Sequence, residues 1–184
     1  NGGTITSYTD TGHLYGDSSN NQLCIFNRND NATAGSGYLC EVIVYNGSIS
    51  SSSRQWIEGY LAYKWSINSL LPSGHPYYSV APTFGYESNY PSQYGMVLWY
   101  DVNDISTLLD ASGNPLTGYN QNVYSIKNKA QFDYTNKLTA ITPSVNTYQQ
   151  LSINGTNKAV VYVGGDDLTA GLYTSGYQSI IPTG

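Results

Sequence analysis

Residues 37–65 of the chain read GYLCEVIVYNGSISSSSRQWIEGYLAYKW. Residues 39–45 are rich in β-branched and aromatic side chains, which predicts a strand. Asn46-Gly47 then supplies turn chemistry. Beyond the turn the apolar side chains recur at helical spacing. The stretch therefore predicts a strand, a turn and a helix in this order.

The helix is expected over residues 52–66, because the serines at 50–53 offer N-cap side chains. Pro72 and Pro76 prevent its continuation. Its apolar residues fall on one side: Trp56, Ile57, Tyr60, Leu61 and Trp65. We expect an amphipathic surface helix packed on the end of a sheet, with Trp56, Tyr60, Tyr63 and Trp65 in the core rather than on sugars.

Short apolar runs separated by polar turns make up most of the remaining sequence. They lie at residues 4–8, 23–26, 96–100, 123–126, 137–141, 150–153 and 159–163. This spacing is typical of an all-β sandwich. The predicted fold class is therefore all-β, with one short amphipathic helix near 52–66.

Composition and charge exclude two classes of partner. The net charge is −5, only 10% of residues are charged, and the 7 Lys and Arg form no basic cluster. We therefore expect no nucleic-acid partner. The longest apolar runs, such as residues 159–163, are too short to cross a bilayer. The 19 Tyr supply apolar bulk that a core can bury.

The chain starts at Asn1 without a signal-peptide pattern, so we interpret it as an internal piece of a longer polypeptide or a processed product. Its two cysteines, Cys24 and Cys40, lie in strand-like runs. They are either buried free thiols or a cross-strand disulfide, which needs Cα atoms within about 7 Å. No Cys or His pairing suggests zinc.

Three segments, two of them within residues 37–65, resemble a known family. Residues 37–46, 54–65 and 71–77 resemble the C-terminal end of a concanavalin A-like (laminin G-like) jelly-roll module, with a strand carrying Glu41, a short helix and a Leu-Pro…His-Pro-Tyr tail. Cys40 and Ser66 depart mildly from that pattern.

The second part of the chain is similar to the opening of another such module. Residues 97–104 match its first strand, and residues 154–165 are similar to its next strand. The resemblance implies an antiparallel jelly-roll sandwich. Residues 1–81 would be the C-terminal part of one module, 82–95 a Pro- and Tyr-rich linker, and 96–184 the N-terminal part of a second module. Each part would leave an open sheet edge, so we expect missing strands to come from outside this stretch.

Modules of this family are common in structural proteins of large DNA viruses and phages, and in secreted bacterial proteins. The resemblance implies a non-enzymatic virion structural protein, such as a minor capsid, spike or fibre component, located in the virion. Its partners would be other virion or surface proteins in a larger assembly, with glycans as a further ligand class. The alternative is a secreted or cell-surface carbohydrate-binding adhesin module. A polysaccharide hydrolase is the third hypothesis.

Catalysis by a hydrolase needs two carboxylates about 5–9.5 Å apart on one face. Along its own strand Glu41 stands alone, because Ile43 and Tyr45 occupy the matching positions. Glu58 falls on the helix, where a solvated role is expected. We therefore predict no catalytic residues and no enzymatic activity.

Oxygen-rich clusters occur at Asp101, Asn103 and Asp104, and again at Asp166-Asp167. The first is a candidate calcium site, because calcium binds six to eight oxygens. Turn-forming Asp and Asn residues are the alternative. No other cofactor is expected.

Tyrosines in and beside the linker are candidates for a protein interface, since Tyr anchors interfaces well. They are Tyr77, Tyr78, Tyr86, Tyr90 and Tyr94. His75 is expected to make structural hydrogen bonds, and His13 is isolated. Asn31, Asn46 and Asn154 begin N-glycosylation patterns.

Overall fold

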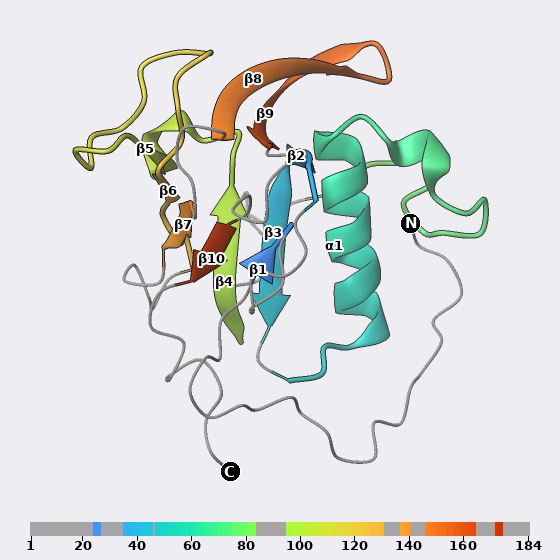
Figure 1. Cartoon of the computed structure of the whole chain (residues 1–184). Coiled ribbons are helices and arrows are strands. Elements are labelled where there is room, and N and C mark those ends of the chain that lie inside the picture. The colour runs from blue at the N-terminus through green and yellow to red at the C-terminus, as the bar shows by residue number, and fades with distance from the viewer. Residues whose placement is uncertain are drawn as a thin grey trace.

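The computed structural model describes residues 24–26, 35–45, 47–83, 95–130, 137–140, 146–164 and 172–174. They form short strands in small antiparallel sheets, together with one α-helix (Figure 1). This arrangement confirms the all-β prediction with one helix. The expected strand at residues 4–8 lies outside the described residues.

The first part of the described chain holds β1 (Cys24–Ile25), β2 (Gly37–Leu39), β3 (Glu41–Tyr45), α1 (Ser51–Lys64) and the 3-10 helix η1 (Asn68–Leu70). The second part holds β4 (Met96–Asp101), the 3-10 helix η2 (Ile105–Thr107), β5 (Leu108–Leu109), β6 (Ser125–Ile126), β7 (Leu138–Ala140), β8 (Asn146–Ile153), β9 (Thr156–Val163) and β10 (Leu172–Thr174). We call residues 24–83 the N-segment and residues 95–174 the C-segment.

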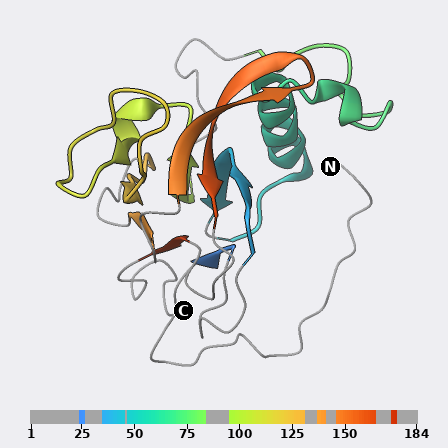
Figure 2. The same ribbon diagram turned by 45° about the horizontal axis from the view of Figure 1, so that its top comes forward.

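The strands form three sheets. The five-stranded sheet has the order β1-β10-β7-β6-β5, the three-stranded sheet β2-β9-β8, and the two-stranded sheet β3-β4. The long β8–β9 hairpin arches over the other strands (Figure 2). The small sheets fit the expected class, while the jelly-roll order remains a proposal.

Strand pairing joins the two segments throughout. β1 pairs with β10, β2 with β9 and β3 with β4, all antiparallel. Among the described strands, none of the three in the N-segment pairs with another strand of that segment. The N-segment thus completes its sheets only with strands from the C-segment.

The predicted helix is confirmed, with bounds close to those expected. The Ser50 side chain accepts a hydrogen bond from the Ser53 N–H and caps the N-terminus. The helix ends at Trp65, and Ser66 adopts a positive φ of 58°, well before Pro72. α1 lies alongside β3 rather than only at the end of a sheet (Figure 1).

A tight turn closes the β8–β9 hairpin and touches the helix. Asn154 and Gly155 have φ values of 46° and 76°, the left-handed pair that a two-residue hairpin turn requires. The Asn154 Nδ2 donates to the Ser66 carbonyl at 3.0 Å. The hairpin tip is therefore fixed to the C-terminal end of α1. Of the three glycosylation patterns, only this Asn lies among the described residues.

One hydrophobic core contains side chains from both segments. Leu39 and Trp65 of the N-segment join a larger C-segment set: Leu98, Tyr100, Val102, Leu108, Leu116, Val123, Ile126, Leu138, Ala140, Tyr148, Ala159, Val160, Val161, Val163 and Leu172. A smaller cluster of Met96, Trp99 and Ala130 packs on the other face of β4, against Ile43 and Tyr45. β4 is thus buried on both faces.

The single strand expected at residues 39–45 is interrupted at Cys40. β2 and β3 lie on either side of this residue and belong to different sheets. Cys40 is a free, half-buried thiol, as one of the two interpretations expected. Burial and the neighbouring negative charge of Glu41 raise the pKa of this thiol, which makes it a poor nucleophile. The division of the chain into parts of two modules remains a prediction.

Candidate functional site

A buried carboxylate stands at the junction of the two segments. Glu41 begins β3, and its side chain is only 1% exposed. The register of β3 and β4 places Asp101 directly opposite it, with Ile43 opposite Trp99. Alternate residues of a strand point to the same face, so Glu41, Trp99 and Asp101 share one face of this sheet.

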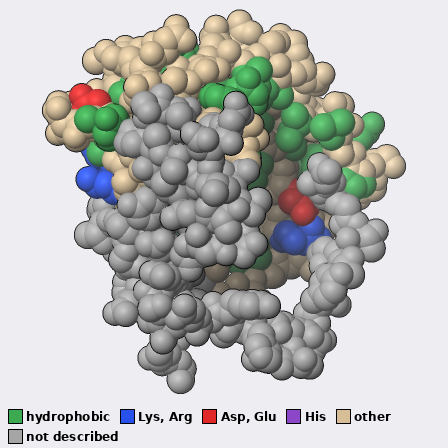
Figure 3. Space-filling view, in the orientation of Figure 1, with side chains coloured by type: hydrophobic (Ala, Val, Ile, Leu, Met, Phe, Trp, Pro, Cys, Tyr) green, Lys and Arg blue, Asp and Glu red, His purple; other side chains and the backbone are tan. Residues whose placement is uncertain are grey.

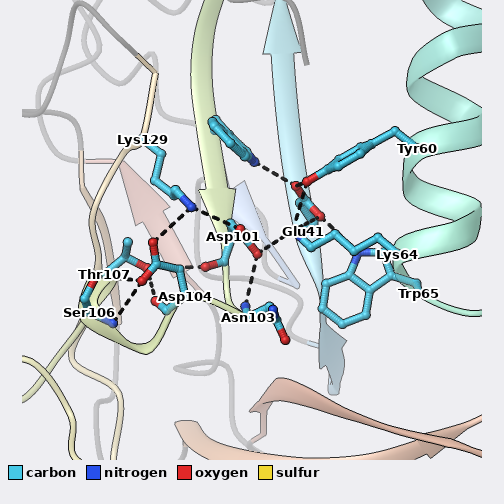
Figure 4. Close-up of polar contacts among 11 residues, drawn as sticks. Glu41, Tyr60, Lys64, Trp65, Asp101, Asn103, Asp104, Ser106, Thr107 and Lys129 are labelled. Atoms are coloured by element: carbon cyan, nitrogen blue, oxygen red, sulfur yellow. Dashed lines mark hydrogen bonds and ion pairs between the residues drawn. The ribbon is translucent and has the colours of Figure 1, made fainter. Parts of the chain in front are cut away.

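Four donors converge on the two oxygens of Glu41 (Figure 4). Oε1 accepts from the Tyr60 hydroxyl at 3.0 Å and from the Trp99 Nε1 at 2.7 Å. Oε2 accepts from the Trp65 Nε1 at 3.0 Å and forms an ion pair with the Lys64 Nζ at 2.8 Å. The charge of this carboxylate is therefore compensated from both segments.

Lysines link Glu41 to two aspartates in one continuous cluster (Figure 4). The Lys64 Nζ lies 2.8 Å from Asp101 Oδ1, so a single ammonium bridges Glu41 and Asp101. The Lys129 Nζ lies 3.1 Å from Asp101 Oδ2 and 3.0 Å from Asp104 Oδ2. We call Glu41, Lys64, Asp101, Lys129 and Asp104 the ion cluster.

A buried asparagine positions Lys129 beside β4. The Asn128 Oδ1 accepts from the backbone N–H of Trp99 at 2.8 Å, and its Nδ2 donates to the Val97 carbonyl at 3.0 Å. The Lys129 N–H donates to the Trp99 carbonyl at 2.7 Å. The Lys129 ammonium then lies 4.5 Å from the centre of the Trp99 ring, a cation–π contact. Residues 128–129 therefore take the place of a neighbouring strand along this edge of β4.

Two pKa shifts follow from these contacts. Burial acts to raise the pKa of Asp104, but hydrogen bonds from Ser106 and Lys129 and the charge of Lys129 outweigh it and lower that pKa. Burial acts to lower the pKa of Lys129, but the charge of Asp101 and the contacts with Asp104 outweigh it and raise that pKa. Both groups are held in their charged forms.

The ion cluster is chemically closed. Buried ions are tolerated only when their charges and hydrogen-bonding atoms are matched, and both oxygens of Glu41 have two donors each. Lys64 donates further to the Tyr60 hydroxyl at 3.0 Å. Such an arrangement fixes α1 against the β3–β4 sheet.

A second polar group ties the tail after the helix to α1. Glu58 forms an ion pair with Arg54 and lies 3.1 Å from the His75 Nε2. The His75 Nδ1 accepts from the Tyr77 N–H at 3.2 Å, which assigns the ring proton to Nε2. His75 is thus a buried structural hydrogen-bonder, as expected, while Glu58 is paired rather than simply solvated.

The three calcium candidates lie together, but the carboxylates of Asp101 and Asp104 form ion pairs with lysines. Asp101 and Asp104 form the ion pairs described above, and Asn103 contributes its backbone N–H to Asp101 Oδ1 at 3.1 Å. The Ser106 N–H donates to Asp104 Oδ1 at 3.2 Å, so both aspartates also shape turns. Within the described ranges no group of three or more His, Cys, Asp or Glu could hold a metal ion. Asp166 and Asp167 lie outside them.

Of the five predicted interface tyrosines, only Tyr77 and Tyr78 lie among the described residues. Tyr78 is 41% exposed and Tyr77 is half-buried, while Tyr86, Tyr90 and Tyr94 lie outside the described residues. Leu70 and Val80 are also exposed, and hydrophobic side chains are visible on the surface where the chain after α1 lies (Figure 3).

A pair of stacked tyrosines forms a separate aromatic surface. Tyr119 is 45% exposed, and its ring centre lies 4.9 Å from that of Tyr148. Burial first, and then the proximity of Tyr119, raise the pKa of Tyr148 to about 12. The Tyr148 phenol therefore remains a neutral hydrogen-bonding group at ordinary pH.

Sequence reasoning missed the lysines of the site. The signal for Lys64 was present, because a Glu in the apolar run of β3 demands a buried cation, and Lys64 follows Tyr60 by one helical turn. Lys129 carries no such signal, since residues 127–130 do not form a recognisable strand.

No described helix is both long and apolar enough to cross a membrane. A scan against protein-family models finds no match to the sequence, and searches of curated proteins and of solved structures find none either.

Proposed function

We propose that the chain is a non-enzymatic structural module of a larger protein assembly. The observation that carries this proposal is the closed ion cluster, in which the strongest chemical groups of the fold bind each other. Glu41 is 1% exposed and already has four donors. Its contacts join helix to sheet, which is a mechanical rather than a chemical role.

The hydrolase alternative requires a second carboxylate facing Glu41 across an open cleft. Asp101 does lie next to Glu41, but Lys64 bridges the two at 2.8 Å each, and the Asp101 side chain is 8% exposed. A sugar would have to displace that lysine and separate α1 from β3. This geometry favours a scaffold over an active site.

The finer form of the proposal comes from the family resemblance of the sequence. This form is a concanavalin A-like jelly-roll module of a virion structural protein, located in the virion. The antiparallel sheets and the helix α1 support the all-β class of such a module. Exposed Leu70, Tyr78 and Val80 after α1 provide a surface for neighbouring subunits.

Analytical ultracentrifugation of the full chain over a range of concentrations tests the proposal. We expect the mass to rise with concentration, and we expect Tyr78→Ser to weaken this association. Tyr119→Ser is the matched control, because Tyr119 has a similar exposure but lies in the C-segment. A monomer at every concentration, or equal effects of the two variants, would contradict the proposal.

A glycan-binding adhesin is the second candidate. The exposed face of Tyr119, held in place by stacking on Tyr148, is the kind of platform on which a sugar ring packs. A glycan array with the full chain is expected to give a signal that Tyr119→Ala removes and Tyr78→Ala retains. The absence of any signal would eliminate this alternative.

A further inference from the structure

We propose that Asn154 is a self-modifying site, at which slow loss of ammonia releases the β8–β9 hairpin from helix α1. The reaction needs only this chain and water, and it goes beyond the assembly role proposed above. Three observations carry it: the Asn154-Gly155 sequence, the open geometry of the turn, and a hydrogen bond to α1 that depends on the side-chain amide.

The attacking atom of this reaction, the backbone nitrogen of Gly155, is accessible. The β8–β9 ladder ends at the pair Ile153 and Thr156, so both turn residues lie outside it. Asn154 and Gly155 are exposed. A Cβ atom built at Gly155 would meet no heavy atom within 4 Å beyond its chain neighbours. Neither a side chain nor a neighbouring segment therefore crowds a ring formed between these two residues.

The chemistry forms a cyclic imide and then opens it. The Gly155 nitrogen bonds to Cγ of Asn154, the Cγ–Nδ2 bond breaks, and Nδ2 leaves as ammonia with the proton of the Gly155 N–H. Water then cleaves one of the two C–N bonds of the ring. Cleavage at Cγ gives aspartate, and cleavage at the backbone carbonyl gives isoaspartate. One water is consumed and one ammonia is released, so no oxidant or reductant is required.

Loss of the amide removes the contact between hairpin and helix. The Asn154 Nδ2 donates to the Ser66 carbonyl at 3.0 Å, and Nδ2 is the atom that leaves. An ionised carboxylate in its place only accepts hydrogen bonds. It also brings negative charge to the C-terminal end of α1, where the helix dipole disfavours an anion. Isoaspartate lengthens the main chain in a turn that sets the register of β8 and β9. Either product therefore frees the hairpin tip that reaches α1 (Figures 1 and 2).

Peptide mapping of the full chain by mass spectrometry tests the modification. Samples are held in mildly alkaline buffer, where the amide nitrogen loses its proton more readily, and are digested at intervals. Electron-transfer fragmentation separates aspartate from isoaspartate. We expect conversion at Asn154 to be several-fold faster than at Asn157. Asn157 is the internal control, because it is exposed on the same hairpin but precedes Lys158 instead of a glycine.

Hydrogen exchange at the backbone amides of Ile153 and Thr156, the pair that closes the hairpin, tests the release. Asn154→Asp imitates one product. Asn154→Gly tolerates the left-handed conformation and cannot lose ammonia. In the aged wild type we expect exchange to accelerate by about fivefold towards the rate of Asn154→Asp, the effect of one hydrogen bond on a local opening equilibrium. Asn154→Gly should exchange at a rate that does not change with age.

Three results would overturn the proposal. The first is an intact Asn154 in samples where Asn157 has already begun to convert. The second is conversion at Asn154 with unchanged exchange at the closing pair, because the amide would then hold nothing. The third is an age-dependent change in Asn154→Gly equal to that of the wild type, since another residue would then be responsible. If Asn154→Asp fails to fold, the aged wild type compared with Asn154→Gly still decides between these results.

Discussion

At the scale of single residues, the molecule depends on how charge is buried at Glu41. A carboxylate in an apolar strand costs several kcal/mol unless cations and donors surround it. Here Lys64, Tyr60, Trp65 and Trp99 supply them. The charged and hydrogen-bonding side chains around Glu41 therefore connect the helix α1 to the β3–β4 sheet.

Lys64→Met tests that connection. The change leaves Glu41 and Asp101 facing each other without the ammonium between them, and we expect a loss of about 3–5 kcal/mol in the free energy of unfolding. Urea denaturation followed by circular dichroism measures it. Lys158→Met is the matched control, and a similar loss there would show that the effect belongs to lysine removal in general.

Asp104→Asn tests how the free energy of unfolding changes as the pH is lowered. The pKa of Asp104 is lowered below its ordinary 3.8 in the folded state, so its carboxylate contributes stability above that value. The contribution is lost as pH falls through the folded pKa. We expect the variant to be less stable than wild type near neutral pH, and the difference to vanish in strong acid. Asn retains the turn-capping bonds to Ser106, so the comparison isolates the charge.

Denaturation curves collected at several pH values between about 2 and 7 measure this difference. A difference between the two proteins that stayed constant down to the lowest pH would show that the charge of Asp104 has no part in stability.

At the scale of elements, α1 shows how close packing sets what the helix can tolerate. Gly59 is buried, and a Cβ atom at this position would lie 2.7 Å from atoms of the Tyr77 side chain. The tail after the helix therefore packs against the backbone of α1 itself. This contact explains a glycine in a helix interior, where it costs about 1 kcal/mol relative to alanine.

Gly59→Ala is expected to lower the free energy of unfolding by about 1–3 kcal/mol, despite the better helix propensity of alanine, because the tail must move. Thermal denaturation gives the size of the effect. Gly74→Ala has open space around its Cβ position and should leave stability nearly unchanged. Stabilisation by Gly59→Ala would show that the tail does not pack on the helix.

Elements differ in how well the sequence predicts them. α1 was predictable because its cap at Ser50 and its apolar spacing are local. The β8–β9 hairpin is longer than expected, because the predicted run 150–153 covers only the end of β8 next to the Asn154-Gly155 turn and the predicted run 159–163 leaves out the first residues of β9. The break at Cys40 was not predictable, since it depends on which distant strands β2 and β3 meet. The aspartates of the ion cluster were anticipated as calcium ligands, but Lys129 depends on the long-range contacts of Asn128.

At the scale of the whole molecule, the two segments share one core and one ion cluster. The C-segment contributes most of that core, and among the described residues the N-segment has no separate core cluster. Shared burial on this scale produces a single cooperative unfolding transition.

Leu98→Ala tests this cooperativity. Leu98 of β4 is 1% exposed, and its truncation should cost about 2–5 kcal/mol. We expect tryptophan fluorescence and far-UV circular dichroism to shift together in one transition. Leu70→Ala, at a 65% exposed position, is the control and should stay within about 0.5 kcal/mol of wild type. Two separate transitions would instead support two independent modules divided near residues 82–95.

The pairing of β1, β2 and β3 only with later strands also has a consequence for biosynthesis. A ribosome adds about 5–20 residues per second, so β1, β2 and β3 are each synthesised seconds before their partners, which are β10, β9 and β4 respectively. During translation Glu41 has none of its C-segment contacts, and α1 has no completed sheet beside it. The nascent chain must therefore stay soluble until its second part is made, and the polar turns between its short strands suit it to that delay.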